Sequence, residues 1–152
     1  STAREFAQQG THVALIDIDE PAAQKVADEL NAQGARALVV KCDVTDDDSV
    51  SATLATVAAE FGGLDIVFNN AGIMDNFESI ADVSNETWEK VFKINLDGPF
   101  KAVRGVIKES IRQQKGNIIN ICLLGIVSSL KYDHMESDSK KPCKKTIGFP
   151  SP

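Results

Sequence analysis

The stretch that most constrains the fold is residues 64–72, where a short apolar run ends in two amides, an alanine and a glycine. A run this short and apolar is typical of a strand that is buried on both faces of a parallel sheet. Its last residues would bring side-chain amides and bare backbone to the carboxyl edge of that sheet. Open α/β sheets bind their ligands at this edge. The stretch therefore predicts a parallel sheet with a ligand site after residue 68.

Strand and helix patterns alternate along most of the chain. Apolar strand patterns occupy residues 12–17, 37–42, 64–68 and 117–121, and helical patterns lie between and before them. We expect Thr45 to cap the helix that ends at Gly62, and Gly98-Pro99 to kink a long helix that starts near Ser84. Strands that alternate with helices over this length predict a parallel sheet with helices on both faces.

Composition excludes several classes of function. The chain has 152 residues, which predicts one domain, and its net charge of −6 argues against a nucleic-acid partner. No apolar run approaches the ~20 residues that a membrane span needs. The three cysteines, Cys42, Cys122 and Cys143, lack metal-ligand spacing, so we predict no metal site. Their odd number and the absence of a signal-like start favour a reducing, cytoplasmic location.

The run Asn69-Asn70-Ala71-Gly72, directly after an apolar strand, resembles the Asn-Asn-Ala-Gly motif of the short-chain dehydrogenase/reductase family. The resemblance covers residues 1–121 and implies a Rossmann-like three-layer α/β fold. It also implies reversible hydride transfer between a nicotinamide cofactor and a small alcohol or carbonyl substrate, and a possible homo-oligomer. We expect residues 1–130 to form a partial NAD(P)-binding domain, and the Lys- and Pro-rich residues 131–152 to form a polar tail unrelated to the family.

Two carboxylates are predicted to contact the adenosine half of the cofactor. A carboxylate at Asp17 can accept both ribose hydroxyls of NAD and would repel the extra phosphate of NADP, and Ile18 offers no cation to bind that phosphate. The resemblance implies that Asp43 accepts a hydrogen bond from the adenine amino group, and that the backbone of Val44 also contacts the cofactor. The alternatives remain that Asp17 solvates a loop and that Asp43 only helps to start the next helix.

The resemblance places Asn70, Ala71 and Gly72 beneath the ribose and phosphates of the cofactor, although an Asn pair can also simply form a turn. Asn95 matches the Asn of the family's catalytic tetrad, which marks a local break in a helix. In the family, a backbone carbonyl freed at that break holds a water of the proton relay. The alternative is that Asn95 is simply a surface residue.

The chain departs from the family pattern at both ends. It lacks the Thr-Gly-x-x-x-Gly-x-Gly loop, and Leu123 stands where the family has a catalytic Ser. Glu136 and Lys140 occupy the positions of the Tyr-x-x-x-Lys pair, and Tyr132 lies four residues early. We therefore expect an incomplete sheet, containing strands two to five of the family, with two strand pairs and unpaired inner edges.

These departures leave two hypotheses about function. The first is a fragment of an NAD-preferring oxidoreductase, with NADP less favoured, that is inactive as this single chain and binds the cofactor weakly or not at all. The second is a non-catalytic product that associates with full-length relatives through the helix at residues 101–114.

Overall fold

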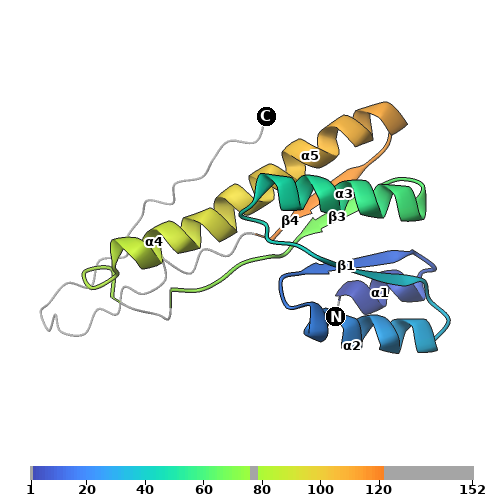
Figure 1. Ribbon diagram of the computed structural model, residues 1–152, viewed down its shortest axis with the longest axis horizontal. Helices are drawn as coiled ribbons and strands as arrows, with labels where there is room; N and C mark the ends of the chain where they lie inside the picture. Colours follow the sequence, from blue (N-terminus) through green and yellow to red (C-terminus); the bar gives the residue numbers. More distant parts are fainter. Residues whose placement is uncertain (1, 76–78, 122–152) are drawn as a thin grey trace, which may run out of the picture.

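The computed structural model describes residues 2–75 and 79–121, in which helices and parallel strands alternate (Figure 1). The elements in chain order are α1 (Thr2–Gln8), β1 (Val13–Asp17), α2 (Glu20–Ala32), β2 (Ala37–Lys41), α3 (Asp47–Phe61), β3 (Ile66–Asn69), α4 (Asn85–Phe92), the π-helical segment η1 (Lys93–Asp97), α5 (Gly98–Gln113) and β4 (Asn117–Asn120). The predicted order of elements is confirmed, with boundaries that differ by a few residues.

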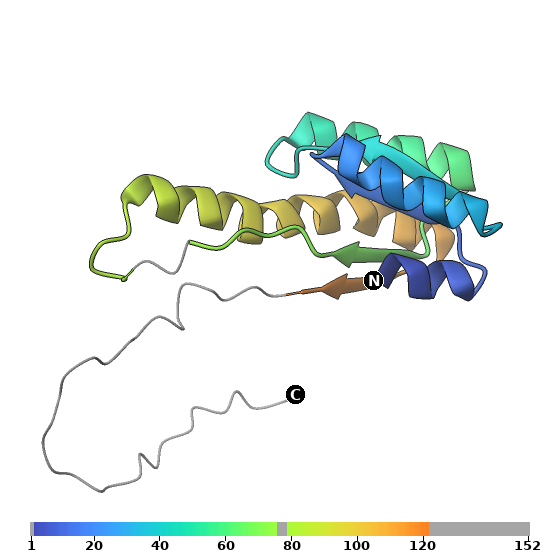
Figure 2. The same cartoon turned by 90° about the horizontal axis from the view of Figure 1, so that it is seen from below.

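The described strands form two separate parallel pairs, β1 with β2 and β3 with β4. Val13 pairs with Ala37 in the first, and Ile66 pairs with Asn117 in the second. The expectation of two strand pairs is thus confirmed. The carboxyl ends of both pairs point toward the same side of the molecule, where the chain leaves each strand (Figure 2).

Helix α2 covers one face of the β1–β2 pair. Its buried residues Ala23, Ala27 and Leu30 recur at helical spacing and face the strands. Asp19 caps this helix by accepting a hydrogen bond from the backbone of Ala22 at 3.0 Å, and Pro21 lies in its first turn. Burying three apolar side chains on one stripe fixes the helix against the pair.

A second core cluster joins the two strand pairs. Val57 of α3, Leu64 and Val106 of α5 are buried together. Apolar side chains from both pairs pack against them: Ala14, Leu38, Val40, Val67 and Ile118. Helix α3 therefore lies over both pairs, and α5 lies beside it, so the two sheets share one apolar layer although they share no strand ladder.

The prediction that Thr45 caps α3 is wrong. Asp46 is the cap, with extended backbone angles (φ −111°, ψ 121°) and a carboxylate that accepts the backbone N–H of Asp48 at 3.0 Å. Thr45 is instead held by its own backbone groups: its N–H donates to Asp43 Oδ1, and its carbonyl accepts from Lys101 Nζ. Asp47 and Asp48 lie in the first turn of α3, where negative charges interact favourably with the helix dipole.

The long helix is interrupted just before Gly98-Pro99 rather than at it. Residues 93–97 form η1, in which the Gly98 N–H donates to the Lys93 carbonyl. Gly98 and Pro99 then open α5, where proline supplies no backbone N–H to a carbonyl of the preceding η1 turn. Ser84 begins α4 as expected, by accepting the Thr87 N–H at 3.0 Å.

Candidate functional site

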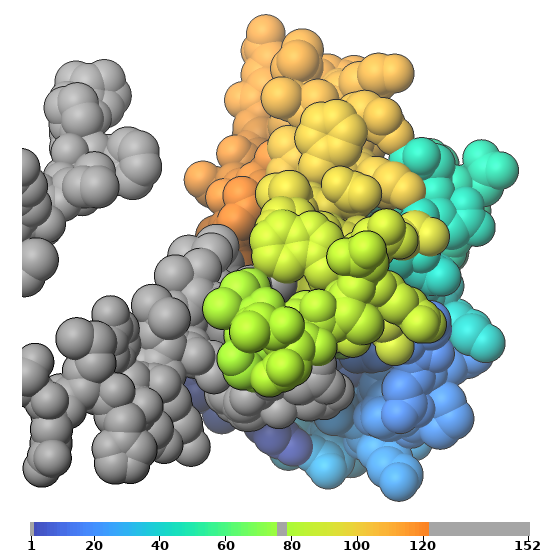
Figure 3. All heavy atoms as spheres, turned by 90° about the vertical axis from the view of Figure 1, so that its left-hand side faces the viewer, coloured from blue at the N-terminus to red at the C-terminus, as the bar shows by residue number. Residues whose placement is uncertain are grey.

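The predicted cofactor residues lie where the strands end. Figure 3 views the molecule from this side, with α4 in yellow-green near the viewer and α3 in cyan beside it. Asp17 is the exposed last residue of β1. Its Oδ1 accepts the backbone N–H of Asp19 at 3.0 Å, which holds the carboxylate near the start of α2. A cavity of about 270 Å³ borders Asp17 and is otherwise lined by Leu15, Ile16, Ala22, Ala23 and Val26.

Asp43 lies next to this strand end. The Cys42 N–H donates to the Asp17 carbonyl at 3.0 Å, which extends the β1–β2 ladder one residue beyond β2. Asp43 is half-buried, its N–H donates to Ser49 Oγ at 3.0 Å, and its Oδ1 accepts the Thr45 N–H at 2.8 Å. The structure thus brings Asp17 and Asp43 together at the ends of two paired strands.

The surroundings of Asp43 favour its ionised form. The backbone N–H of Thr45 is the main cause of a lowered pKa for this carboxyl, followed by the Thr45 side chain. The positive charges of Lys93 and Lys101 lower the pKa further, while burial opposes them. A carboxylate held in this way is an acceptor of hydrogen bonds and a poor donor.

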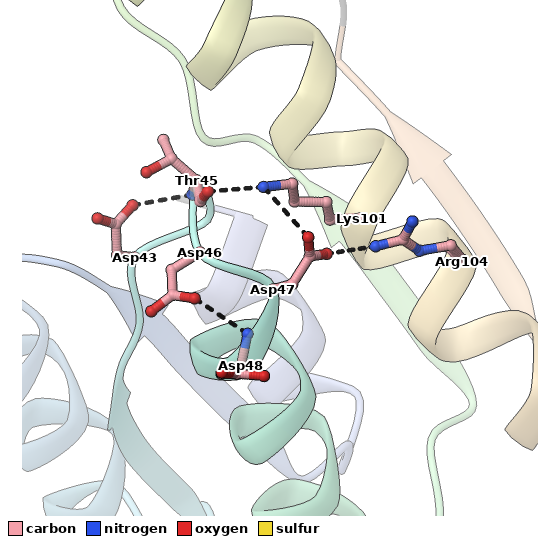
Figure 4. A network of polar contacts seen from close by, with 7 residues as sticks. All are labelled: Asp43, Thr45, Asp46, Asp47, Asp48, Lys101 and Arg104. Atoms are coloured by element: carbon pink, nitrogen blue, oxygen red, sulfur yellow. Dashed lines mark hydrogen bonds and ion pairs between the residues drawn. The ribbon is translucent and has the colours of Figure 1, made fainter.

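The loop that carries Asp43 is anchored on α5 (Figure 4). Gly98 is buried against Val44: a Cβ added to it would lie 3.0 Å from Val44 Cγ2. One turn further along, Lys101 Nζ donates to the Thr45 carbonyl at 2.6 Å and lies 3.6 Å from Asp47 Oδ2. Arg104 pairs with the other carboxylate oxygen of Asp47.

Asn70, Ala71 and Gly72 are exposed and follow β3, in the other strand pair. Just before them, Asn69 Nδ2 donates to Asn120 Oδ1 at 2.8 Å, which ties the ends of β3 and β4 together. Small, exposed residues at a strand end let a ligand approach the backbone closely. This arrangement suits a ligand-contacting segment, and no contact within the described residues joins it directly to Asp17.

Asn95 holds the segment after Gly72 in place. Its Oδ1 accepts the Ile73 N–H and its Nδ2 donates to the Ile73 carbonyl, both at 2.8 Å. Asn95 lies within η1, so the helix break expected at this residue is confirmed. The relay function of a freed carbonyl there stays a prediction.

One continuous helical run therefore supports both parts of the site. Asn95 of η1 binds the backbone after β3, and Gly98 and Lys101 of α5 contact the loop after β2. Asn95 was predicted from the sequence as a site residue, and that role stays a prediction, whereas Lys101 was not identified. A basic i, i+3 pair on a helix and a run of aspartates were visible in the sequence, but a single sequence does not show that they meet.

Several predicted positions lie outside the described residues. They are Leu123, Ser128, Ser129, Tyr132, Glu136 and Lys140. Within residues 2–75 and 79–121, no group of His, Cys, Asp and Glu side chains could hold a metal ion. None of the helices in that part of the chain is long and apolar enough to span a membrane.

A larger cavity, of about 310 Å³, lies at the opposite end of the first strand pair. It is bordered by the turns at Gly10–His12 and Gly34–Arg36 and by the ends of α1 and α2. None of the predicted site residues lines it. The carboxyl end of the strands, where the predicted residues gather, is therefore the better-supported candidate site.

Comparisons with known proteins place the chain in a family. The family model described as short chain dehydrogenase matches residues 1–130. The short chain dehydrogenase/reductase dpmpG of Macrophomina phaseolina is 34% identical over 119 residues, which are 76% of this chain and 68% of that protein. The cyclohexanol dehydrogenase of an Acinetobacter strain is 35% identical over 79% of this chain and 48% of its own length.

Solved structures agree. The NAD⁺-bound xylitol dehydrogenase matches with a TM-score of 0.76 and 34% identity over 78% of this chain and 46% of that one. A metagenomic short-chain oxidoreductase in complex with NADP matches with a TM-score of 0.73 and 28% identity, covering 78% and 53%. This chain belongs to the short-chain dehydrogenase/reductase family and has its Rossmann-like oxidoreductase fold. It spans about half the length of the cyclohexanol dehydrogenase and of these two solved structures.

Proposed function

We propose that this chain supplies the adenosine-side half of an NAD site in a short-chain oxidoreductase. The observation that carries the proposal is the adjacency of Asp17 and Asp43 at the ends of β1 and β2. The exposed Asp17 carboxylate suits two ribose hydroxyls, and the ionised Asp43 suits the adenine amino group as an acceptor. Asn70, Ala71 and Gly72 would approach the nearby ribose and phosphate, and Asn95 would serve the catalytic end.

NAD is preferred to NADP in this proposal because of charge. A carboxylate at the end of β1 would repel a 2′-phosphate, and the neighbouring Ile18 is apolar. One positive charge near the site opposes this preference for NAD: Lys41 lies directly opposite Asp17 in the strand register. If Lys41 binds a phosphate, replacing Asp17 alone would suffice to favour NADP, and Lys41→Met would then abolish that gain.

The reaction of the assembled enzyme would be reversible hydride transfer between the nicotinamide and a small alcohol or carbonyl substrate. Relatives named as cyclohexanol, cyclopentanol and xylitol dehydrogenases support that substrate class. The nicotinamide would supply the hydride chemistry, while the residues described here bind and orient the adenosine half. A cytoplasmic location, a homo-oligomer and the division into a domain at 1–130 and a tail at 131–152 remain parts of the proposal.

The 152 residues by themselves are proposed to be inactive. Their single tyrosine, Tyr132, is followed four residues later by Glu136, where the family has a Lys. Loss of a general acid costs on the order of 10²–10⁴-fold in rate. Calorimetric titration should give no NAD affinity tighter than ~10 μM, and NADH oxidation with a panel of ketones should match the buffer blank. Turnover that is lost on replacing Tyr132 would contradict this proposal.

The second candidate is a non-catalytic product that associates with full-length relatives through residues 101–114. Exposed apolar side chains on this part of α5 favour it: Ile107 is 47% exposed and Ile111 is 70% exposed. Co-purification with a full-length family member, lost in an Ile107→Asp/Ile111→Asp variant, would support association. If the chain is monomeric and does not co-purify with such a partner, only the fragment hypothesis is left.

A further inference from the structure

Lys101 is placed unusually for a lysine. Its side chain is only 18% exposed, although lysine ammonium groups are rarely buried unless they are paired. The Nζ atom donates to the Thr45 carbonyl at 2.6 Å and lies 3.6 Å from the Asp47 carboxylate, which is 56% exposed. The shorter contact is thus to a neutral backbone oxygen, and the ion pair is the looser of the two.

The two sides of Thr45 connect Lys101 to Asp43. The Thr45 carbonyl accepts from Lys101, and the Thr45 N–H donates to Asp43 Oδ1 at 2.8 Å (Figure 4). Val44 lies between Asp43 and Thr45 in the chain, and its side chain packs against Gly98. A charge-assisted hydrogen bond to the loop is stronger than a neutral one. Its loss would free the loop at the point that orients the Asp43 carboxylate.

We propose that Lys101 is a positioning residue which, through Thr45, holds the Asp43 carboxylate and the Val44 backbone in the orientation that an adenine nucleotide requires. This inference rests on the proposed function of the loop. It goes beyond it by assigning the loop's geometry to one side chain on α5, a helix that carries none of the predicted nucleotide contacts.

Arg104 offers a matched control on the same helix. It carries the same charge, lies one turn further along, and pairs with Asp47. It contacts no atom of Thr45 among the described residues, its guanidinium packs on the Phe100 ring at 5.2 Å, and its side chain is 53% exposed. Removing either charge weakens the hold on Asp47, but only the loss of Lys101 releases the Thr45 carbonyl.

The test uses the complete 152-residue chain with ¹³C-labelled aspartate and ¹⁵N-labelled backbone. The variants are Lys101→Met, Lys101→Arg and Arg104→Met. Two quantities are measured by NMR: the pKa of the Asp43 carboxyl, and the shifts of the Val44 and Thr45 amides as AMP is added up to millimolar concentration. AMP is the probe because it carries the adenine and ribose without the pyrophosphate.

We expect Lys101→Met to raise the pKa of Asp43 and to weaken AMP binding about three- to tenfold, the effect of losing one hydrogen bond. Lys101→Arg should restore part of both effects, and Arg104→Met should leave AMP binding within about twofold. Equal effects of Lys101→Met and Arg104→Met, or no change in either, would overturn the inference. If AMP shifts nothing in the unmodified chain, the proposed cofactor role fails. Faster exchange of the Thr45 amide in Lys101→Met, but not in Arg104→Met, still decides whether Lys101 positions the loop.

Discussion

The two strand pairs differ in how completely their faces are covered. The β1–β2 pair lies between α2, with Ala27 and Leu30 each 1% exposed, and the layer formed by α3. The β3–β4 pair packs Val67 and Ile118 against α3 and α5. On its other face, within the described residues, side chains remain open: Ile66 is 39% exposed, Ile119 40% and Ile121 46%.

This difference separates the candidate site into two kinds of residue. Asp17 and Asp43 end a pair that helices α2 and α3 cover on its two faces, although Ile16, beside Asp17, is still 42% exposed. Asn70, Ala71 and Gly72 follow a strand that is packed on one face. Their position depends more on Asn95, which reaches them through the Ile73 backbone. Packing fixes the strand ends of the first half, where hydrogen bonds then orient the Asp43 loop, whereas the second half depends mainly on the hydrogen bonds of Asn95.

The largest expected effect comes from opening the core of the covered pair. Leu30→Ala removes a fully buried side chain and leaves a cavity between α2 and the strands, so we expect a loss of about 2–5 kcal/mol in the free energy of unfolding. Ile119→Ala, on the open face, should cost less than about 1 kcal/mol. Urea denaturation followed by circular dichroism measures both. Equal losses would contradict the difference in covering.

The next effect separates two asparagines with the same hydrogen-bond pattern. Asn95 bridges the N–H and carbonyl of Ile73, and Asn31 bridges the N–H and carbonyl of Ala37. Asn95 is half-buried and Asn31 is exposed. We expect Asn95→Ala to cost about 1–3 kcal/mol, since it leaves partly buried backbone groups unpaired, and Asn31→Ala about 0.5–1.5 kcal/mol.

Amide hydrogen exchange tells the two variants apart locally. The Ile73 amide should exchange faster in Asn95→Ala while the Ala37 amide does not change, and the reverse should hold in Asn31→Ala. If Asn95→Ala leaves the exchange of Ile73 as it was, the hydrogen bonds to Asn95 do not position the segment after β3.

The smallest effect is a dependence of stability on acid. Folding lowers the pKa of Asp43 below its usual 3.8, chiefly through the Thr45 N–H, so folding favours the ionised form. The stability from this group is present above the unfolded pKa and is lost as the pH falls through the folded pKa. Asp43→Asn should therefore flatten the loss of stability below about pH 4. Denaturant midpoints from pH 7 to pH 3 measure it, with Asp46→Asn as the comparison, and parallel curves for both variants would contradict it.

Much of this architecture could be predicted because the sequence states it locally. The apolar spacing of Val50, Leu54 and Val57 gives α3, and the positive-φ Gly62 ends it. The two-pair sheet followed from the resemblance to the family. The cap of α3 was predicted one residue early because Thr45 and Asp46 both suit a cap and the local sequence does not separate them. The contacts of Asn95 and Lys101 could not be predicted because their partners are distant in sequence.

The most direct test of the central claim, that Asp17 and Asp43 form the adenosine side of an NAD site, is the cofactor preference of a completed enzyme. A strand and Gly-rich loop taken from a relative such as xylitol dehydrogenase would be joined ahead of Ser1. That relative's Ser, Tyr and Lys segment would replace the residues from Cys122 onward. Stopped-flow or steady-state assays of carbonyl reduction would then compare NADH with NADPH.

We expect this chimera to prefer NADH, and Asp17→Ala with Ile18→Arg to shift the preference toward NADPH by on the order of tenfold or more, because the change removes a repulsive carboxylate and adds a phosphate partner. A chimera that folds and reduces carbonyls but favours NADPH before either substitution would contradict the role assigned to Asp17.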